Sequence, residues 1–115
     1  MQIHLDSEIY EQVKNGTKNV EARVNDEKRQ QLKIGDIIEI VKRPDENESL
    51  RVRITSLKRF SNFDELADNY PIEQLYSASF TKEQYLALFP KFYSNEEINK
   101  YGTVAIEFEV IKEDC

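Results

Sequence analysis

Three charged residues, Lys18, Glu21 and Arg23, lie within six positions of one another in this chain. Glu21 and Arg23 are two apart, so on a strand both side chains would face one side, about 7 Å apart. Lys18 has the opposite parity, and it joins them only if the strand begins after it or a bulge turns it. In a shared cleft, the cations would hold a phosphate or polarise a carbonyl group. The carboxylate would accept a hydrogen bond from a base amine or activate water.

The same three residues are equally compatible with an ion pair on the protein surface. Such an exposed pair contributes about 0–1 kcal/mol to stability and has no chemical role. Charged groups are held near a core only where they are paired or used, so a cleft would indicate function. From the residues alone, both interpretations stay open.

The segments that must position these charges form a predicted strand, helix and strand. A short strand at residues 3–5 precedes a helix that is capped by Asp6 or Ser7 and ends near Asn15. We expect Gly16 to end this helix, because glycine adopts the left-handed conformation without a Cβ clash. Residues 19–24 then alternate between apolar and polar side chains, which predicts a half-buried strand. Its buried face is expected to carry Val20, Ala22 and Val24.

The rest of the chain predicts two more strands, a helical region and a final strand. A strand at 37–41, a loop over 43–49 and a long strand from Leu50 come first, and the last strand covers 103–111. Between them, three spacings are typical of helix starts: Ser61 to Asp64, Thr81 to Gln84 and Ser94 to Glu97. This order is compatible with a small mixed barrel in which the last strand pairs with an early one. The strand order itself cannot be read from the sequence.

Three short motifs, in this order along the chain, resemble those of ASCH domains, small relatives of the PUA RNA-binding domain. They are Gly16-x-Lys18-x-x-Glu21-x-Arg23, Leu32-Lys33-x-Gly35-Asp36 and Tyr101-Gly102-x-Val104-Ala105-Ile106. The whole chain looks like the small stand-alone bacterial and archaeal members. The resemblance implies one α+β domain over 1–115, a PUA-like mixed β-barrel with surrounding short helices. It further implies a cleft lined by Lys18, Glu21 and Arg23 that binds RNA or a nucleotide-like ligand.

The resemblance also suggests an enzymatic alternative. One branch of this superfamily hydrolyses acetylcytidine, and it has a threonine three residues after the lysine, where this chain has Glu21. In a modified scheme, Glu21 would activate water and Lys18 would stabilise the oxyanion. The branch also uses a glutamate from the helical region, for which Glu73 is the nearest candidate. The chain would then be an amidohydrolase acting on acetylated cytidine or a related modified nucleoside. A protein-interaction domain with a vestigial cleft is a third hypothesis.

Basic and aromatic residues elsewhere supply further candidates for RNA contact. Arg51 and Arg53 belong to a basic strand that could follow a phosphate backbone, or could equally form the solvent face of that strand. Tyr93 and Tyr101 lie at loop or helix ends, where their rings could stack on unpaired bases. Other apolar residues of this half are expected to pack the helices onto the barrel, as core aromatics commonly do: Phe63, Leu66, Tyr85, Leu88, Phe89 and Phe92.

Composition limits the class of protein. The net charge of −6 argues against broad, nonspecific binding to nucleic-acid backbone, so any contact needs a local basic patch. No apolar run approaches the roughly 18 residues that cross a bilayer, and no secretory signal begins the sequence. One cysteine, Cys115, and one histidine, His4, exclude a disulfide framework and a multi-histidine metal site. We therefore expect a cytoplasmic protein without membrane contact, metal or cofactor, and the oligomeric state stays open.

Overall fold

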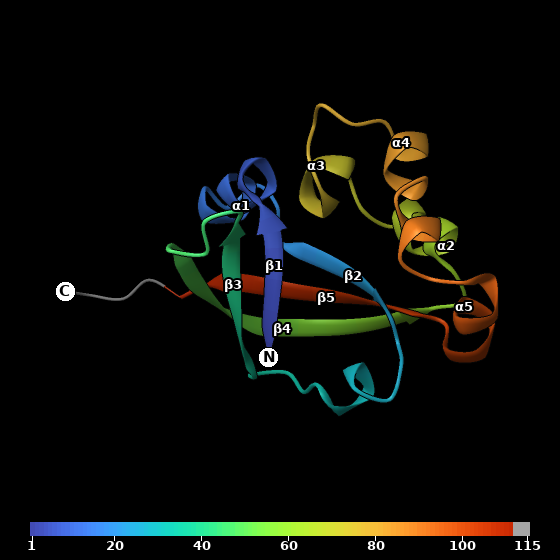
Figure 1. The fold of residues 1–115 in the computed structure, drawn as a ribbon. Helices are drawn as coiled ribbons and strands as arrows, with labels where there is room; N and C mark the ends of the chain where they lie inside the picture. Colours follow the sequence, from blue (N-terminus) through green and yellow to red (C-terminus); the bar gives the residue numbers. More distant parts are fainter. Residues whose placement is uncertain (112–115) are drawn as a thin grey trace.

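Five strands form one curled sheet, a half-barrel, in the computed structural model, which describes residues 1–111 (Figure 1). The strands are β1 Gln2–Asp6, β2 Val20–Val24, β3 Ile37–Arg43, β4 Ser49–Phe60 and β5 Thr103–Val110. Their order across the sheet is β1-β3-β4-β5-β2. β1 runs parallel to β3, and the other three pairings are antiparallel. The last strand therefore pairs with the early strand β2, as the sequence suggested.

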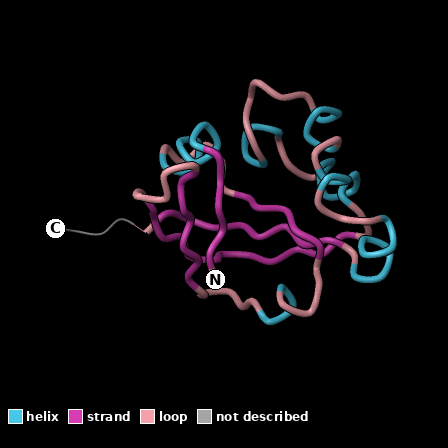
Figure 2. The backbone as a smooth tube through the Cα atoms, in the orientation of Figure 1, coloured by secondary structure: helices cyan, strands magenta, loops and turns pink. Residues whose placement is uncertain are grey.

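Short helices surround this sheet and give the protein its α+β, PUA-like fold (Figure 2). The first, α1, connects β1 to β2, and the others follow β2 or β4. Their bounds are α1 Ser7–Lys14, η1 Arg29–Gln31, α2 Phe63–Asp68, α3 Ile72–Leu75, α4 Lys82–Leu86, η2 Phe89–Lys91 and α5 Asn95–Tyr101. In Figure 1, α2, α4 and α5 gather on one side of the sheet, away from α1.

The helix starts agree with two of the three predicted capping sites. Thr81 and Ser94 each accept a hydrogen bond from the backbone three residues on, and the reciprocal bonds of the capping box are present. The third prediction is wrong by one residue, because Asn62 and not Ser61 caps α2. The Asn62 side-chain oxygen accepts from the backbone N–H of Glu65 at 2.8 Å. Asparagine is at least as good an N-cap as serine, so the helix begins one position later.

Two apolar clusters make up the core. The first lies between α1 and the sheet, and it contains Ile3, Tyr10, Val13, Ile38, Ile40, Val52, Ile54, Val104, Ile106 and Phe108. The second lies under the helices that follow β4, and it contains Val20, Ala22, Val24, Phe63, Leu66, Ala67, Leu75, Tyr85, Phe89 and Ala105. The apolar face of β2 thus belongs to the second cluster. Glu21 and Arg23 alternate with these residues along β2.

Candidate ligand-binding site

The strand register places Glu21 and Arg23 on the inner face of the half-barrel. Glu21 lies opposite Ile106 and Arg23 opposite Val104 in the pairing of β2 with β5. Directly opposed residues of an antiparallel pair share one face of the sheet, and both partners belong to the first core cluster. The two charged side chains therefore lie on the same face of the sheet as these apolar residues, on the edge strand β2.

Lys18 reaches Glu21 because the chain is not yet a strand at that point. Gly16 has a φ of +89° and ends α1, and β2 begins only at Val20. Between them, the backbone N–H of Lys18 donates to the Gln12 carbonyl at 3.0 Å, which turns the chain back across the helix. The condition set by the sequence, a strand that begins after Lys18, is met.

The Lys18 ammonium group is buried, and all three of its protons have hydrogen-bond acceptors. The residue is 1% exposed, and its Nζ donates to the carbonyl oxygens of Val20 and Leu75, each at 2.6 Å, and to Glu21 Oε1 at 3.3 Å. Burial lowers the pKa of Lys18, and the Glu21 carboxylate opposes that shift. An ammonium group has three protons, and here each has an acceptor. Lys18 thus connects β2 to the end of α3 and keeps no donor for a ligand.

The Glu21 carboxylate lies between two cations. Glu21 is 7% exposed; its Oε1 lies 3.3 Å from Lys18 Nζ and its Oε2 lies 3.2 Å from Arg23 Nη2. Burial alone would raise the pKa of Glu21, but the charges of Arg23 and Lys18 hold it below its usual value. The group is therefore an ionised acceptor in the wall of the site.

Arg23 is the ligand-accessible cation of the three. Its side chain is 23% exposed, and the Glu21 carboxylate raises its pKa, with a smaller contribution from Tyr93. Two cations against one carboxylate leave the cluster with a net positive charge. This cluster therefore favours an anionic or strongly polar ligand, although the chain as a whole is acidic.

A cavity of about 400 Å³ opens beside Glu21 and Arg23. Residues of β1 and β2 line it, so it lies where the two edge strands leave the half-barrel open. Its opposite wall is aromatic and comes from the segment between α3 and α5. The lining residues are His4, Leu5, Asp6, Ile9, Glu21, Ala22, Arg23, Arg29, Arg43, Tyr76, Tyr85, Leu88, Phe89, Lys91, Phe92 and Tyr93. A mostly apolar cavity with a few convergent polar groups is typical of a small-molecule site.

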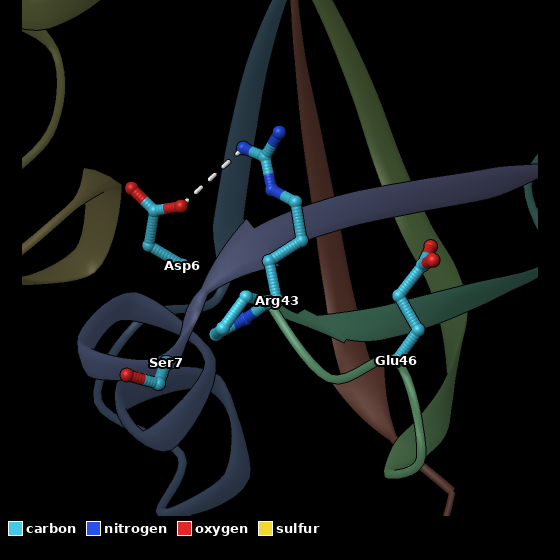
Figure 3. A pocket seen from close by; sticks show the side chains of 5 residues that line it. Asp6, Ser7, Arg43 and Glu46 are labelled. Carbon is cyan, nitrogen blue, oxygen red and sulfur yellow. Dashed lines mark ion pairs between the residues drawn. The ribbon is translucent and has the colours of Figure 1, made fainter.

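A second hollow, of about 550 Å³, lies outside this cavity at the ends of β1 and β3. Figure 3 shows Asp6 and Arg43 directed toward each other, with Ser7 and Glu46 nearby. Arg43 Nη2 and Asp6 Oδ1 are 3.5 Å apart. This outer hollow is lined by five residues, none of them aromatic or buried. Although larger, it offers a ligand less contact than the cavity, which we take as the candidate site.

The other predicted site residues are distributed unevenly around the cavity. Tyr93 lines it, whereas Tyr101 packs at the edge of the second core cluster, with Lys100 Nζ 5.0 Å from its ring centre. Arg51 and Arg53 are exposed on β4, where Arg53 pairs with Glu109 at 3.6 Å, and neither lines the cavity. Glu73 is exposed on α3 and also lies outside the lining.

Phe92 was expected in the core, and that prediction is wrong. The side chain is 74% exposed at the rim of the cavity. The preceding residues, Phe89–Lys91, form a 3-10 turn that contains Pro90. The tighter turn rotates Phe92 away from the face that Tyr85 and Phe89 share.

Residues 1–111 contain no candidate metal site and no candidate membrane-spanning helix. This range contains no group of three or more His, Cys, Asp or Glu side chains that could hold a metal ion. None of its helices combines the length and apolar character needed to span a bilayer. Cys115, the single cysteine, lies outside the described residues.

Comparison with known proteins gives a consistent family and fold. A model of the ASCH domain matches residues 3–112. The crystal structure of hypothetical protein PH0355 has a TM-score of 0.78 and 33% identity, over 96% of this chain and 97% of that one. The solution structure of protein PF0455 from Pyrococcus furiosus has a TM-score of 0.72 and 29% identity, over 98% and 100%.

A more distant likeness concerns the fold alone. The crystal structure of a ZmASCH mutant protein from Zymomonas mobilis has a TM-score of 0.59 and 14% identity. It covers 96% of this chain and 70% of that one. No curated protein matches the chain significantly.

Proposed function

Because this chain belongs to the ASCH domain family, we propose that it binds RNA or a nucleotide-like ligand in the cavity beside Glu21 and Arg23. The observation that carries this proposal is the ionised Glu21 carboxylate in the wall of the cavity, with Arg23 beside it at 3.2 Å. A carboxylate has about four lone-pair sites, more than these two cations use. A ligand N–H group can therefore donate to it, and the exocyclic amine of a nucleobase is such a donor.

The neighbouring guanidinium extends this match. Glu21 and Arg23 present an acceptor and several donors side by side, which is the complement of a base edge that carries an amine next to a ring nitrogen or carbonyl. Tyr76, Tyr85 and Tyr93 offer aromatic surface against which a planar base can pack. Base stacking on an aromatic side chain contributes about 1–3 kcal/mol. The arrangement supports recognition of a heterocycle rather than of phosphate alone.

The amidohydrolase hypothesis receives less support from the same geometry. A carboxylate whose pKa lies below normal is a weak base toward water, and Lys18 Nζ has no proton to offer an oxyanion. No serine, threonine or cysteine is among the cavity's lining residues within the described chain. We therefore assign Glu21, Arg23 and Tyr93 to ligand binding and Lys18 to the positioning of Glu21.

Calorimetric titration of the purified protein with ribonucleoside monophosphates and short unpaired RNAs tests the proposal. Arg23→Ala is expected to keep the fold and weaken binding at least tenfold, because a charge-assisted hydrogen bond contributes about 1.5–3 kcal/mol. Arg53→Ala is the matched control, since Arg53 is an exposed, ion-paired arginine outside the cavity. If no nucleotide or RNA binds the wild-type protein, the proposed function is refuted. Equal loss from both variants would place the binding surface elsewhere.

A further inference from the structure

Phe92 is an exposed aromatic ring in a region where the other rings pack together. It is 74% exposed, the highest value among the large apolar side chains of the described residues. Phe63 stacks on Phe89 with ring centres 3.8 Å apart and on Tyr93 at 5.9 Å. None of the ring pairs found in residues 1–111 includes Phe92. The Phe92 ring is therefore exposed and available to a partner.

The residue before Phe92 adds a positive charge at the same rim. Lys91 is exposed, lines the cavity, and takes part in none of the ion pairs of the described residues. The other basic residues of the lining differ, because Arg29 pairs with Asp26 and Arg43 with Asp6. The chain has a net charge of −6, but this part of the rim combines a positive charge with an exposed aromatic ring. It favours an anionic partner that also presents a flat apolar surface.

The size of the cavity decides how much of such a partner can enter. At about 400 Å³ it is near the small end of ligand sites, which matches one nucleotide and not two. A strand with one base in the cavity must therefore leave across the rim. There, the next phosphate would meet Lys91 and the next base would meet Phe92. Proteins that bind single strands use this combination of cation and stacking ring.

We propose that Phe92 and Lys91 form a second subsite, which stacks the neighbouring base of an unpaired RNA strand and binds its phosphate while one nucleotide occupies the cavity. This inference rests on the proposed function and specifies its ligand as an unpaired oligoribonucleotide rather than a free mononucleotide. An apolar peptide would also cover the ring, but it would give Lys91 no negative partner.

The test compares two dissociation constants for each protein, one for ribonucleoside monophosphates and one for short unpaired RNAs containing the same base. Stacking of one base should make the wild-type protein bind the RNA about 5- to 150-fold more tightly. Phe92→Ala should reduce this ratio toward one, whereas Phe92→Tyr should preserve it. Lys91→Gln should lower the slope of log affinity against log salt by about 0.7. Ile34→Ala is the control, because Ile34 is 68% exposed but does not line the cavity.

The outcomes separate the two proposals. If mononucleotides bind but RNA binds no more tightly, the second subsite is refuted and the proposed function stands. The same conclusion follows if Phe92→Ala leaves the ratio unchanged. If neither ligand binds, the proposed function itself fails. If Phe92→Ala spares RNA affinity but abolishes self-association in sedimentation experiments, the rim is a protein contact and the inference is overturned.

Discussion

Replacing Lys18 by methionine removes a buried ammonium group while keeping an unbranched side chain of similar length. In the wild-type protein this group satisfies the Val20 and Leu75 carbonyl oxygens and one oxygen of Glu21. The substitution leaves both carbonyl groups without that donor, and Glu21 is left with Arg23 as its counter-ion. The substitution therefore removes three interactions at once. Because Lys18 is 1% exposed, water does not replace the lost donor.

The expected magnitude follows from these interactions. Breaking a buried ion pair by removing one partner destabilises a protein by about 3–5 kcal/mol. Each carbonyl left without a partner adds up to about 1–3 kcal/mol. Part of this loss is offset, because the variant no longer buries a charged ammonium group. Domains of this kind unfold with a free energy of about 5–15 kcal/mol. We expect Lys18→Met to lower the free energy of unfolding by about 3–5 kcal/mol, a large share of the total.

Urea unfolding at pH 7 measures this loss, with Lys14→Met as the matched control. Lys14 also pairs with a glutamate, Glu48 at 2.8 Å, but on the surface, so its loss should change stability by at most about 1 kcal/mol. If the free energy of unfolding of Lys18→Met is within about 1 kcal/mol of the wild-type value, the buried hydrogen bonds of Lys18 do not stabilise the fold.

Three further predictions concern acidity, backbone geometry and catalysis. Because the pKa of Glu21 is lower in the folded than in the unfolded state, its stabilisation is present above the usual value of 4.5. The stability advantage of the wild type over Glu21→Gln should therefore shrink as pH falls from about 5 through the folded pKa, and a pH-independent difference would contradict the assignment. Gly102→Ala should destabilise more than Gly16→Ala in thermal melts. Both glycines have positive φ, but a Cβ at Gly102 would lie 2.8 Å from the Phe60 carbonyl oxygen, whereas one at Gly16 meets nothing within 4 Å. Incubation with acetylcytidine should release acetate slowly or not at all, and rapid release that requires Glu21 would make the enzymatic hypothesis primary.

Local patterns predicted the segment that presents the charged residues. The alternation of Val20, Ala22 and Val24 indicated β2, and Gly16 marked the end of α1. Both are set by neighbours within a few residues, since one face of a strand must be buried and one backbone position needs a positive φ. The same locality explains why the capping residues Thr81 and Ser94 were found correctly.

The lining of the cavity depends on contacts that no local pattern contains. Lys18 is saturated because Leu75, 57 residues later, brings its carbonyl to the ammonium group. Arg43 reaches the cavity because β3 lies parallel to β1, which pairs it with Asp6. Phe92 faces solvent at the end of a 3-10 turn that no local pattern predicted. Residue types suggested the chemistry, but strand order and a change of helix type decided which side chains meet.

The position of β2 at the edge of the sheet has a consequence for folding during synthesis. Within residues 1–111, β2 pairs only with β5, and Glu21 lies opposite Ile106. A ribosome synthesises the N-terminal segment first, so the charged strand β2 has no strand partner until β5 has emerged. Contacts between segments so far apart in sequence also close slowly, because a long loop must be ordered first. The candidate site is therefore among the last parts of this domain to assemble, and a nascent chain stalled before β5 has the charged residues without the cavity beside them.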